Sequence, residues 1–224
     1  MSISFCHYGN TKMASYRYRV AIPARELNAQ INNPNADVMI CCKPTVQDIP
    51  YTLKAREAGR VVIMDYCDLH FDDPVYTELL KLAHGVTVAT EWMKTYMREE
   101  FGVLATVVPD PYEYDEAPPH WGDGSLLWFG HAANWYSAQR VLGDLNQPLM
   151  VVSNFDGAIP WSQENLLREL AIASIVIMPE TAPYKSANRT IEAIRRGCFV
   201  VAEPHPAIND FPGIWIGNIK RGIE

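Results

Sequence analysis

Short apolar runs alternate with segments of helical pattern along the first half of the chain. Runs rich in Val, Ile, Cys and Met, which predict strands, lie at residues 3–8, 36–42, 60–68, 86–90 and 105–111. Segments that predict helices lie between them, at residues 18–31, 46–59, 72–85 and 91–102. Pro74 suits a first helical turn and Gly59 suits a helix end. Pro23 must lie near the first turn of its helix or kink it.

The same alternation begins again in the second half. Predicted strands lie at residues 126–130, 148–153, 175–179 and 198–203. Predicted helices lie at residues 134–145, 160–174 and 186–196. Ser162 stands at the N-cap position of the second of these helices, ahead of "QENL". Residues 205–224 indicate a loop, a short strand and the start of a further helix.

The two halves are separated by residues 112–125, which are rich in proline, glycine and acidic residues and have no apolar period. Continuous apolar strands that alternate with helices are typical of parallel sheets covered on both faces. The predicted fold is α/β, with two Rossmann-like parallel-sheet domains. Residues 1–116 form the first domain, 117–124 the linker and 125–224 the second domain. Ligands of such sheets bind beyond the carboxyl ends of the strands.

Composition and charge narrow the classes of function. The 224 residues are 48% hydrophobic, which is enough for a sizeable core. The net charge of −7 argues against a general nucleic-acid binder, because no domain-wide basic field exists to attract phosphate backbones. The five cysteines are odd in number and form no CxxC pair, so neither a zinc site nor a disulfide framework is predicted. With reduced thiols and no apolar run of roughly 20 residues, we expect a cytoplasmic protein without a transmembrane segment.

The segment "YKSANRTIEAIRRG" at residues 184–197 places several charged and polar side chains at the start of one predicted helix. Free N–H groups at a helix N-terminus favour a phosphate, and Lys185 and Arg189 add full positive charges. Glu192 lies about one turn further along, where a carboxylate suits a ribose diol. This pattern describes a site for a nucleoside diphosphate. The alternative is a surface helix on which Glu192 pairs with neighbouring arginines.

Several motifs, in this order, resemble glycosyltransferases of the GT-B fold. The stretch from "PWSQENLLRELAIASIVIMP" through "YKSANRTIEAIRRGCFVVAEPHPAI" is similar to their donor-binding domain, most of all in the retaining "group 1" glycosyl transferases. "LLWFGHAANW" resembles the glycine loop that opens that domain. "VVIMDYCDLHFDD", "GVTVATEWMKTYM" and "ATVVPDPYEYDE" resemble parts of the acceptor domain. Tyr184 stands where the family has the first of two glutamates, and the chain resembles a short or truncated member.

The resemblance implies two domains that face a cleft, with a nucleotide-sugar donor held by the second. The implied donor-binding residues are Gly130, Lys185, Ser186, Asn188, Arg189 and Glu192. Arg189 would also act in catalysis by stabilising the departing phosphate. Such enzymes offset leaving-group charge with cations and helix dipoles, so we expect no metal and no cofactor. The acceptor, which the sequence leaves open, is a saccharide, a lipid or a protein.

Two further groups follow strands of the first half. Arg17 and Arg19, in "SYRYR", are candidates to bind phosphate or an anionic acceptor, or are surface charges of a helix start. Asp65, Asp68 and His70, in "DYCDLH", would supply a general base in an inverting enzyme and would position the acceptor in a retaining one. Loop capping is the structural alternative for them, and a metal site is the least favoured.

The predicted function is transfer of a sugar from a nucleoside diphosphate sugar to an acceptor, by a metal-independent hexosyltransferase. One alternative is a non-catalytic sugar-nucleotide-binding protein of the same fold. Another is a GT-B sugar-nucleotide epimerase. An NAD-dependent dehydrogenase is disfavoured because no glycine-rich dinucleotide fingerprint follows the first strand of either half.

Overall fold

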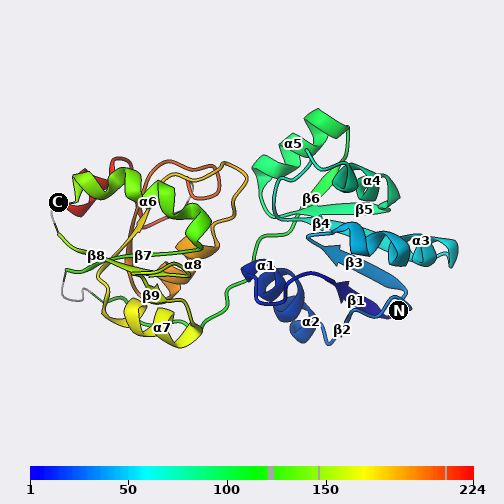
Figure 1. Ribbon diagram of the computed structural model, residues 1–224, viewed down its shortest axis with the longest axis horizontal. Coiled ribbons are helices and arrows are strands. Elements are labelled where there is room, and N and C mark those ends of the chain that lie inside the picture. The colour runs from blue at the N-terminus through cyan, green and yellow to red at the C-terminus, as the bar shows by residue number, and fades with distance from the viewer. Residues whose placement is uncertain (121–123, 146, 210) are drawn as a thin grey trace. The chain divides into compact units, whose positions relative to one another are not determined.

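The computed structural model describes residues 1–120, 124–145, 147–209 and 211–224 (Figure 1). The chain divides into two compact units. Unit 1 consists of Met1–Glu113 together with Tyr184–Ser186, and unit 2 of Tyr114–Pro183 together with Ala187–Glu224. Residues 121–123 of the predicted linker lie outside the described residues.

Unit 1 is built on a six-stranded sheet in the order β2-β1-β3-β4-β5-β6, and every pairing in it is parallel (Figure 1). The strands are β1 (Ile3–Cys6), β2 (Gln30–Ile31), β3 (Val38–Cys42), β4 (Val61–Tyr66), β5 (Gly85–Val88) and β6 (Ala105–Val107). The chain order reverses between the neighbouring strands β1 and β3. That reversal is the topological switch point, beside which open parallel sheets bind ligands.

The helices of unit 1 connect these strands. They are α1 (Ala14–Tyr16), the π-helical turn η1 (Arg17–Ala21), α2 (Ile22–Glu26), η2 (Val46–Asp48), α3 (Ile49–Glu57), α4 (Pro74–Leu82) and α5 (Glu91–Phe101). Their ends follow the side-chain chemistry, since Asp73 and Thr90 accept hydrogen bonds from the backbone of the first turns of α4 and α5. Gly59 adopts a φ of 71° directly after the end of α3, as predicted for a helix terminus.

The helix predicted at residues 18–31 differs from the one observed. Helical structure begins at Ala14 and ends at Glu26, and Gln30 and Ile31 instead form an edge strand. The wider π-helical turn comes just before Pro23, which has no N–H to donate to the carbonyl of Arg19. The thiol of Cys42 donates a hydrogen bond to that carbonyl at 3.0 Å. The predicted helix was therefore wrong at both ends, whereas Pro23 does lie in the first turn of α2, as predicted.

Unit 2 is built on a second six-stranded parallel sheet, in the order β12-β11-β10-β7-β8-β9 (Figure 1). The strands are β7 (Leu126–Phe129), β8 (Leu149–Ser153), β9 (Ile159–Pro160), β10 (Ile175–Met178), β11 (Phe199–Ala202) and β12 (Trp215–Ile216). The order reverses between β7 and β10, so the switch point of this sheet lies beyond Phe129 and Met178.

The helices of unit 2 are η3 (Ala132–Asn134), α6 (Trp135–Val141), η4 (Leu142–Asp144), α7 (Gln163–Ile172), α8 (Asn188–Arg195) and α9 (Ile219–Ile223). Ser162 caps α7, as predicted, because its hydroxyl accepts a hydrogen bond from the N–H of Asn165 at 3.0 Å. The described part of the predicted linker is bonded to this unit: the N–H groups of Ala117 and His120 donate to the carbonyls of Arg195 and Gly197.

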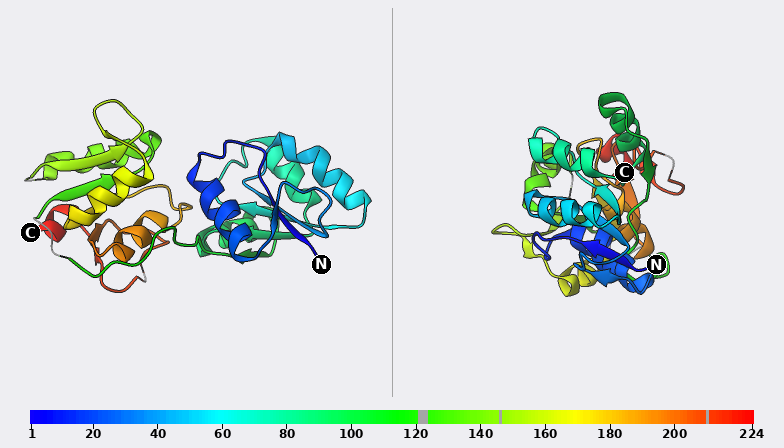
Figure 2. Two further views of the ribbon diagram at one scale, coloured as in Figure 1. Left: turned by 90° about the horizontal axis from the view of Figure 1, so that it is seen from below. Right: turned by 90° about the vertical axis from the view of Figure 1, so that its right-hand side faces the viewer.

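Each sheet is buried on both faces, which confirms the predicted α/β fold class (Figure 2). In β1, Cys6 packs into the cluster around Leu79, whereas Phe5 packs against Val20 on the opposite face. In β7, Leu127 and Trp128 likewise enter two different clusters. Alternate residues of a strand point to opposite faces, so continuous apolar strands require helices on both sides.

Gly197, which follows α8, is a position where only glycine fits. Its φ is 83°, and a Cβ there would lie 2.2 Å from the carbonyl oxygen of Pro118. Gly157 in the same unit has a φ of 91°, but a Cβ there would meet no atom of the described residues within 4 Å. We expect Gly157→Ala to lower the free energy of unfolding by about 1–2 kcal/mol through backbone strain alone. Gly197→Ala should add about 1–3 kcal/mol of overpacking to that strain.

Chemical denaturation of both variants followed by tryptophan fluorescence measures this difference. Equal losses in the two variants would show that the Pro118 contact imposes no constraint on this helix end.

Candidate functional site

Helix α8 begins at the edge of the unit 2 sheet where β10 ends, without a side-chain cap. Ala187 is the N-cap residue and has no side chain that could accept a hydrogen bond. Neither Ser186 nor Asn188 caps this helix. The Ser186 hydroxyl bonds the Asp110 carboxylate, and the Asn188 side chain accepts from the N–H of Arg189, the next residue. The helix N-terminus keeps its positive end uncompensated by a cap.

Arg189 extends from the first turn of α8 to the carboxyl end of β7. Its Nη1 donates to the carbonyl oxygen of Phe129 at 3.2 Å, and its guanidinium carbon lies 5.9 Å from the centre of the Trp128 ring. A Cβ at Gly130 would come within 3.1 Å of the same Nη1 and 3.2 Å of Trp128. Glycine at position 130 therefore leaves the space that Arg189 occupies. The structure brings together Gly130 and Arg189, two of the predicted donor-binding residues.

The charge of Arg189 is not neutralised by an acidic side chain in the described part of the chain. No carboxylate oxygen there lies within 4.0 Å of its guanidinium. Desolvation lowers the pKa of Arg189 to about 10, and Tyr136 opposes this only in part. The group is still a cation at neutral pH, and a partly desolvated cation without a counter-charge is a favourable site for an anion.

Glu192 lies one turn after Asn188, with its side chain buried and 2% exposed. Thr190 and Ala193 are also buried. Glu192 therefore does not lie on a solvent-exposed face of α8, as the alternative of a surface helix requires. Arg195 and Arg196 donate hydrogen bonds to the carbonyls of Tyr114 and Asp115, and Arg195 also lies 3.9 Å from the Glu116 carboxylate.

Lys185 and Ser186 belong to unit 1 and not to the unit that holds Arg189. The ammonium of Lys185 pairs with Asp68, and the Ser186 hydroxyl bonds Asp110. The structure therefore separates the predicted donor-binding residues. Gly130, Asn188, Arg189 and Glu192 share unit 2, while Lys185 and Ser186 are engaged by carboxylates of unit 1. A phosphate-binding role for these two residues stays a prediction.

Asp65 and Arg19, predicted to act on substrate, form a buried ion pair. Arg19 is 4% exposed and binds both oxygens of Asp65; its Nη1 also donates to the Val108 carbonyl at 2.6 Å. Thr87 donates a further hydrogen bond to Asp65 at 2.6 Å. Asp110 lies 3.2 Å from the same Nη1, and burial raises the pKa of Asp110 although Arg19 opposes the shift. These contacts favour a structural role for Arg19 and Asp65.

The remaining predicted residues of unit 1 are differently placed. Asp68 pairs with Lys43 at 2.7 Å as well as with Lys185. Burial alone would raise the pKa of Asp68, but the two ammonium groups outweigh it and lower the pKa below its usual range. His70 is exposed, and its ring meets the edge of Tyr76 at 5.4 Å between centroids. Arg17 bonds Glu113 at 2.6 Å. Catalytic and acceptor-binding roles for these residues stay predictions.

Two aromatic residues lie beside Arg189, and the sequence analysis placed neither of them in the donor site. Trp128 lies under the guanidinium, is fully buried and packs against Trp135 with ring centroids 5.1 Å apart. Tyr136 is 60% exposed in the first turn of α6 and acts electrostatically on Arg189. Their positions in the sequence could have identified them, because both lie within seven residues of the end of β7. Parallel sheets bind ligands at that edge.

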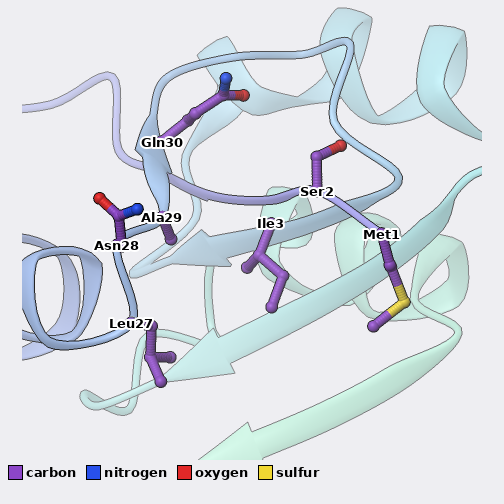
Figure 3. Close-up of a pocket in the computed structure, with 7 residues that line it drawn as sticks. All are labelled: Met1, Ser2, Ile3, Leu27, Asn28, Ala29 and Gln30. Atoms are coloured by element: carbon purple, nitrogen blue, oxygen red, sulfur yellow. The ribbon is translucent and has the colours of Figure 1, made fainter.

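A small pocket of unit 1 lies away from all these groups (Figure 3). Its volume is about 190 Å³, and Met1, Ser2, Ile3, Leu27, Asn28, Ala29 and Gln30 line it. These residues precede or open β1 and β2, so the pocket lies at the amino ends of the strands. Ligand pockets are typically about 300–1,000 Å³, and parallel sheets bind ligands at the opposite edge. We assign this pocket no role.

Comparisons with known proteins support the fold. No family model and no curated protein matches the chain in sequence. Three crystal structures of Anabaena Alr3699/HepE match in structure. The complex with UDP and glucose has a TM-score of 0.71 and 12% identity, covering 100% of this chain and 89% of that chain. The complex with UDP has a TM-score of 0.67 and 13% identity, and the match covers 100% of this chain and 88% of that chain. The complex with UDP-glucose has a TM-score of 0.67 and 13% identity, and the match covers 99% of this chain and 87% of that chain.

At these identities the likeness shows the fold, which is of the GT-B type. Among the described residues, no helix is both long enough and apolar enough to cross a bilayer.

The buried Arg19–Asp65 pair predicts a large effect on stability. Asp65→Asn keeps the side-chain shape but removes a charge that Arg19 needs in the interior. We expect the free energy of unfolding of unit 1 to fall by roughly 3 kcal/mol, because a buried charge loses its main counter-charge. Glu26→Gln is the matched control, since Glu26 and Arg25 form an exposed pair with side chains 64% and 72% exposed.

The control should lose at most about 1 kcal/mol. Urea titration with circular dichroism measures both variants. A loss as small for Asp65→Asn as for Glu26→Gln would contradict a structural role for the pair.

Proposed function

We propose that the protein is a glycosyltransferase that takes its sugar from a nucleoside diphosphate sugar bound by unit 2. The observation that carries the proposal is the Arg189 guanidinium at the switch point of that sheet, with no carboxylate partner in the described chain. A pyrophosphate supplies the missing negative charge, and the uncapped start of α8 adds its free N–H groups.

The buried Glu192 carboxylate supplies the second part of donor recognition. One helical turn separates Glu192 from Asn188. Helix α8 would therefore supply both the groups that bind the diphosphate and the carboxylate that binds the ribose. A carboxylate accepts two hydrogen bonds from a ribose diol, whereas it would repel a phosphate. Gly130 lets the chain approach Arg189 without a side chain between them. Gly130, Asn188, Arg189 and Glu192 are thus the proposed donor-binding residues.

The HepE structures make a uridine donor the first to test. That protein was crystallised with UDP, with UDP and glucose, and with UDP-glucose. In the proposed reaction Arg189 stabilises the negative charge that develops on the departing diphosphate, as electrostatic catalysis requires. Because a fixed cation fills this role, we propose that transfer needs no metal and no cofactor. The acceptor is a saccharide, a lipid or a protein.

Arg189→Ala should weaken binding of UDP by about 10-fold to 100-fold, the range expected for a lost charge-assisted hydrogen bond. Binding of uridine, which has no phosphate, should change far less. Isothermal titration calorimetry with both ligands measures the contrast. Arg168→Ala is the control, because Arg168 is a 57% exposed arginine of the same unit that pairs with Glu169. An equal loss for UDP and uridine would refute the assignment of Arg189 to the diphosphate.

Incubation with UDP-, GDP-, ADP- and dTDP-sugars, with and without EDTA, separates the remaining candidates. Release of the nucleoside diphosphate, at the same rate when EDTA is present, is the expected result. Saturable binding without release indicates a sugar-nucleotide-binding protein, which Tyr184 at the position of the first family glutamate favours. Recovery of an isomerised donor indicates an epimerase.

A further inference from the structure

The carboxylate of Glu203 ties together three elements of unit 2 at the ligand-binding edge of its sheet. Arg140, in the last turn of α6, donates to both of its oxygens, with Nη1 3.1 Å from Oε1 and Nη2 bonded to Oε2. The N–H of Glu180, two residues after β10, donates to Oε2 at 2.7 Å. The N–H of Glu203, which directly follows β11, donates in turn to the carbonyl of Met178 at 3.0 Å. The chain that leaves β10 is therefore fixed against α6 and β11.

The side chain of Glu180 differs from that of Glu203 because it is exposed and unused. Its carboxylate forms no ion pair and accepts no hydrogen bond from any residue that the structure describes. Its main chain, in contrast, is held by the bond to Glu203, and Pro179 in front of it has a fixed φ. A carboxylate with a fixed main chain and oxygens open to solvent is preorganised and accessible to a ligand.

The strand order places Glu180 beside the proposed diphosphate site. Strand β10 ends at Met178 and its neighbour β7 ends at Phe129, and the register of this pair, continued to the strand ends, sets the two residues opposite each other. Neighbouring strands lie about 4.8 Å apart. Arg189 donates to the carbonyl of Phe129. Glu180 therefore leaves the sheet next to the cation that has no carboxylate partner in the described chain.

Electrostatic effects within unit 2 agree with this placement. The hydrogen bonds to Glu203 raise the pKa of Arg140, although desolvation opposes them. The negative charge of Glu180 adds to the rise, and so does an ionised Tyr136. Tyr136 also acts on Arg189. Tyr136 thus lies within electrostatic range of both arginines, and Glu180 lies within range of one of them.

The order of groups in the donor decides which of them Glu180 can bind. A nucleoside diphosphate sugar consists, in order, of a base, a ribose, a diphosphate and the sugar to be transferred. In the proposed site Glu192 binds the ribose and Arg189 binds the diphosphate. A free carboxylate repels a phosphate and accepts hydrogen bonds from hydroxyl groups. Beyond the diphosphate, the hydroxyl groups of the donor belong to the transferred sugar.

We propose that Glu180 binds hydroxyl groups of the transferred sugar and thereby selects a neutral hexose over a hexuronic acid. This rests on the proposed function. The two oxygens of the carboxylate accept hydrogen bonds from neighbouring hydroxyl groups. A hexuronic acid brings a second negative charge to the same place, and like charges repel. Arg140 does not offset that repulsion, because its own charge is compensated by Glu203.

The variant Glu180→Ala tests the contact with the sugar. Isothermal titration calorimetry compares UDP, GDP, ADP and dTDP with the glucose conjugate of each. We expect the affinity for the conjugate to fall by about 10-fold, as for a lost hydrogen bond to a charged group. The affinity for the diphosphate alone should not fall, because the variant removes a negative charge beside it. A general disturbance of unit 2 would weaken both ligands, so the ratio of the two affinities is the decisive quantity.

Glu116→Ala is the matched control for this measurement. Glu116 is an acidic residue of unit 2 with a side chain 79% exposed, and it lies 3.9 Å from Arg195 in the last turn of α8, at the opposite end of that helix from Arg189. Both affinities should match the wild type in this variant. The melting temperatures of the two variants should also match the wild type, because both side chains are exposed.

The variant Glu180→Gln tests the selection against a sugar acid. A glutamine keeps an oxygen that accepts a hydrogen bond but removes the charge. The wild type should bind the glucose conjugate about 10-fold more tightly than the glucuronic acid conjugate of the same nucleotide. Glu180→Gln should remove most of this difference, because the repulsion between two carboxylates is gone.

The outcomes distinguish this inference from the function on which it rests. The inference is overturned if Glu180→Ala leaves the ratio of the two affinities unchanged, which a solvated surface carboxylate predicts. It is also overturned if the wild type binds a nucleoside diphosphate but not its glucose conjugate, or binds both sugar conjugates equally well. The nucleotide site of unit 2 would stand in each of these cases. A wild-type protein that binds none of the nucleoside diphosphates would overturn the proposed function, and this inference with it.

Discussion

The bond from the Arg189 guanidinium to the Phe129 carbonyl organises the candidate donor site. It ties the first turn of α8 to the end of β7, across the point where the strand order of unit 2 reverses. Two features of the chain permit it: a glycine at position 130 and a flat indole at Trp128 beside the guanidinium. Because a carbonyl dipole only partly offsets a full charge, the guanidinium keeps the capacity to bind an anion.

The two units differ in whether their charged side chains have partners of opposite charge. In unit 1, Arg19 is matched by Asp65 and Asp110, and Asp68 is matched by Lys43 and Lys185. Such compensated networks hold loops in place and leave little capacity to bind a ligand. Arg189 of unit 2 differs from them, and it lies at the switch point of its sheet. Function is therefore assigned to the charged group that has no counter-charge in the described chain, and structure to those whose charges are compensated.

Hydrophobic alternation was enough to predict most strands and helices, because a parallel sheet buried on both faces needs uninterrupted apolar runs with helices between them. It failed at residues 14–31, where a π-helical turn precedes α2 and residues 30–31 form a strand. It also missed the short edge strands β2 and β9, whose residues have too few positions to show a period. Gly59 and Ser162 were found correctly because each acts through local backbone chemistry.

The sequence by itself determined the order of elements, the two parallel sheets and the presence of Arg189, Glu192 and Gly130 near one sheet edge, since each depends on neighbours within a few residues. Only the tertiary structure decided which charges are compensated. Lys185 and Arg189 look equivalent along the chain, yet one meets Asp68, 117 residues away in sequence, and the other meets a backbone carbonyl. The ring of His7 likewise lies 3.0 Å from the carbonyl oxygen of Cys42, 35 residues away in sequence. Charge compensation and desolvation depend on contacts between distant segments, and local sequence does not encode those contacts.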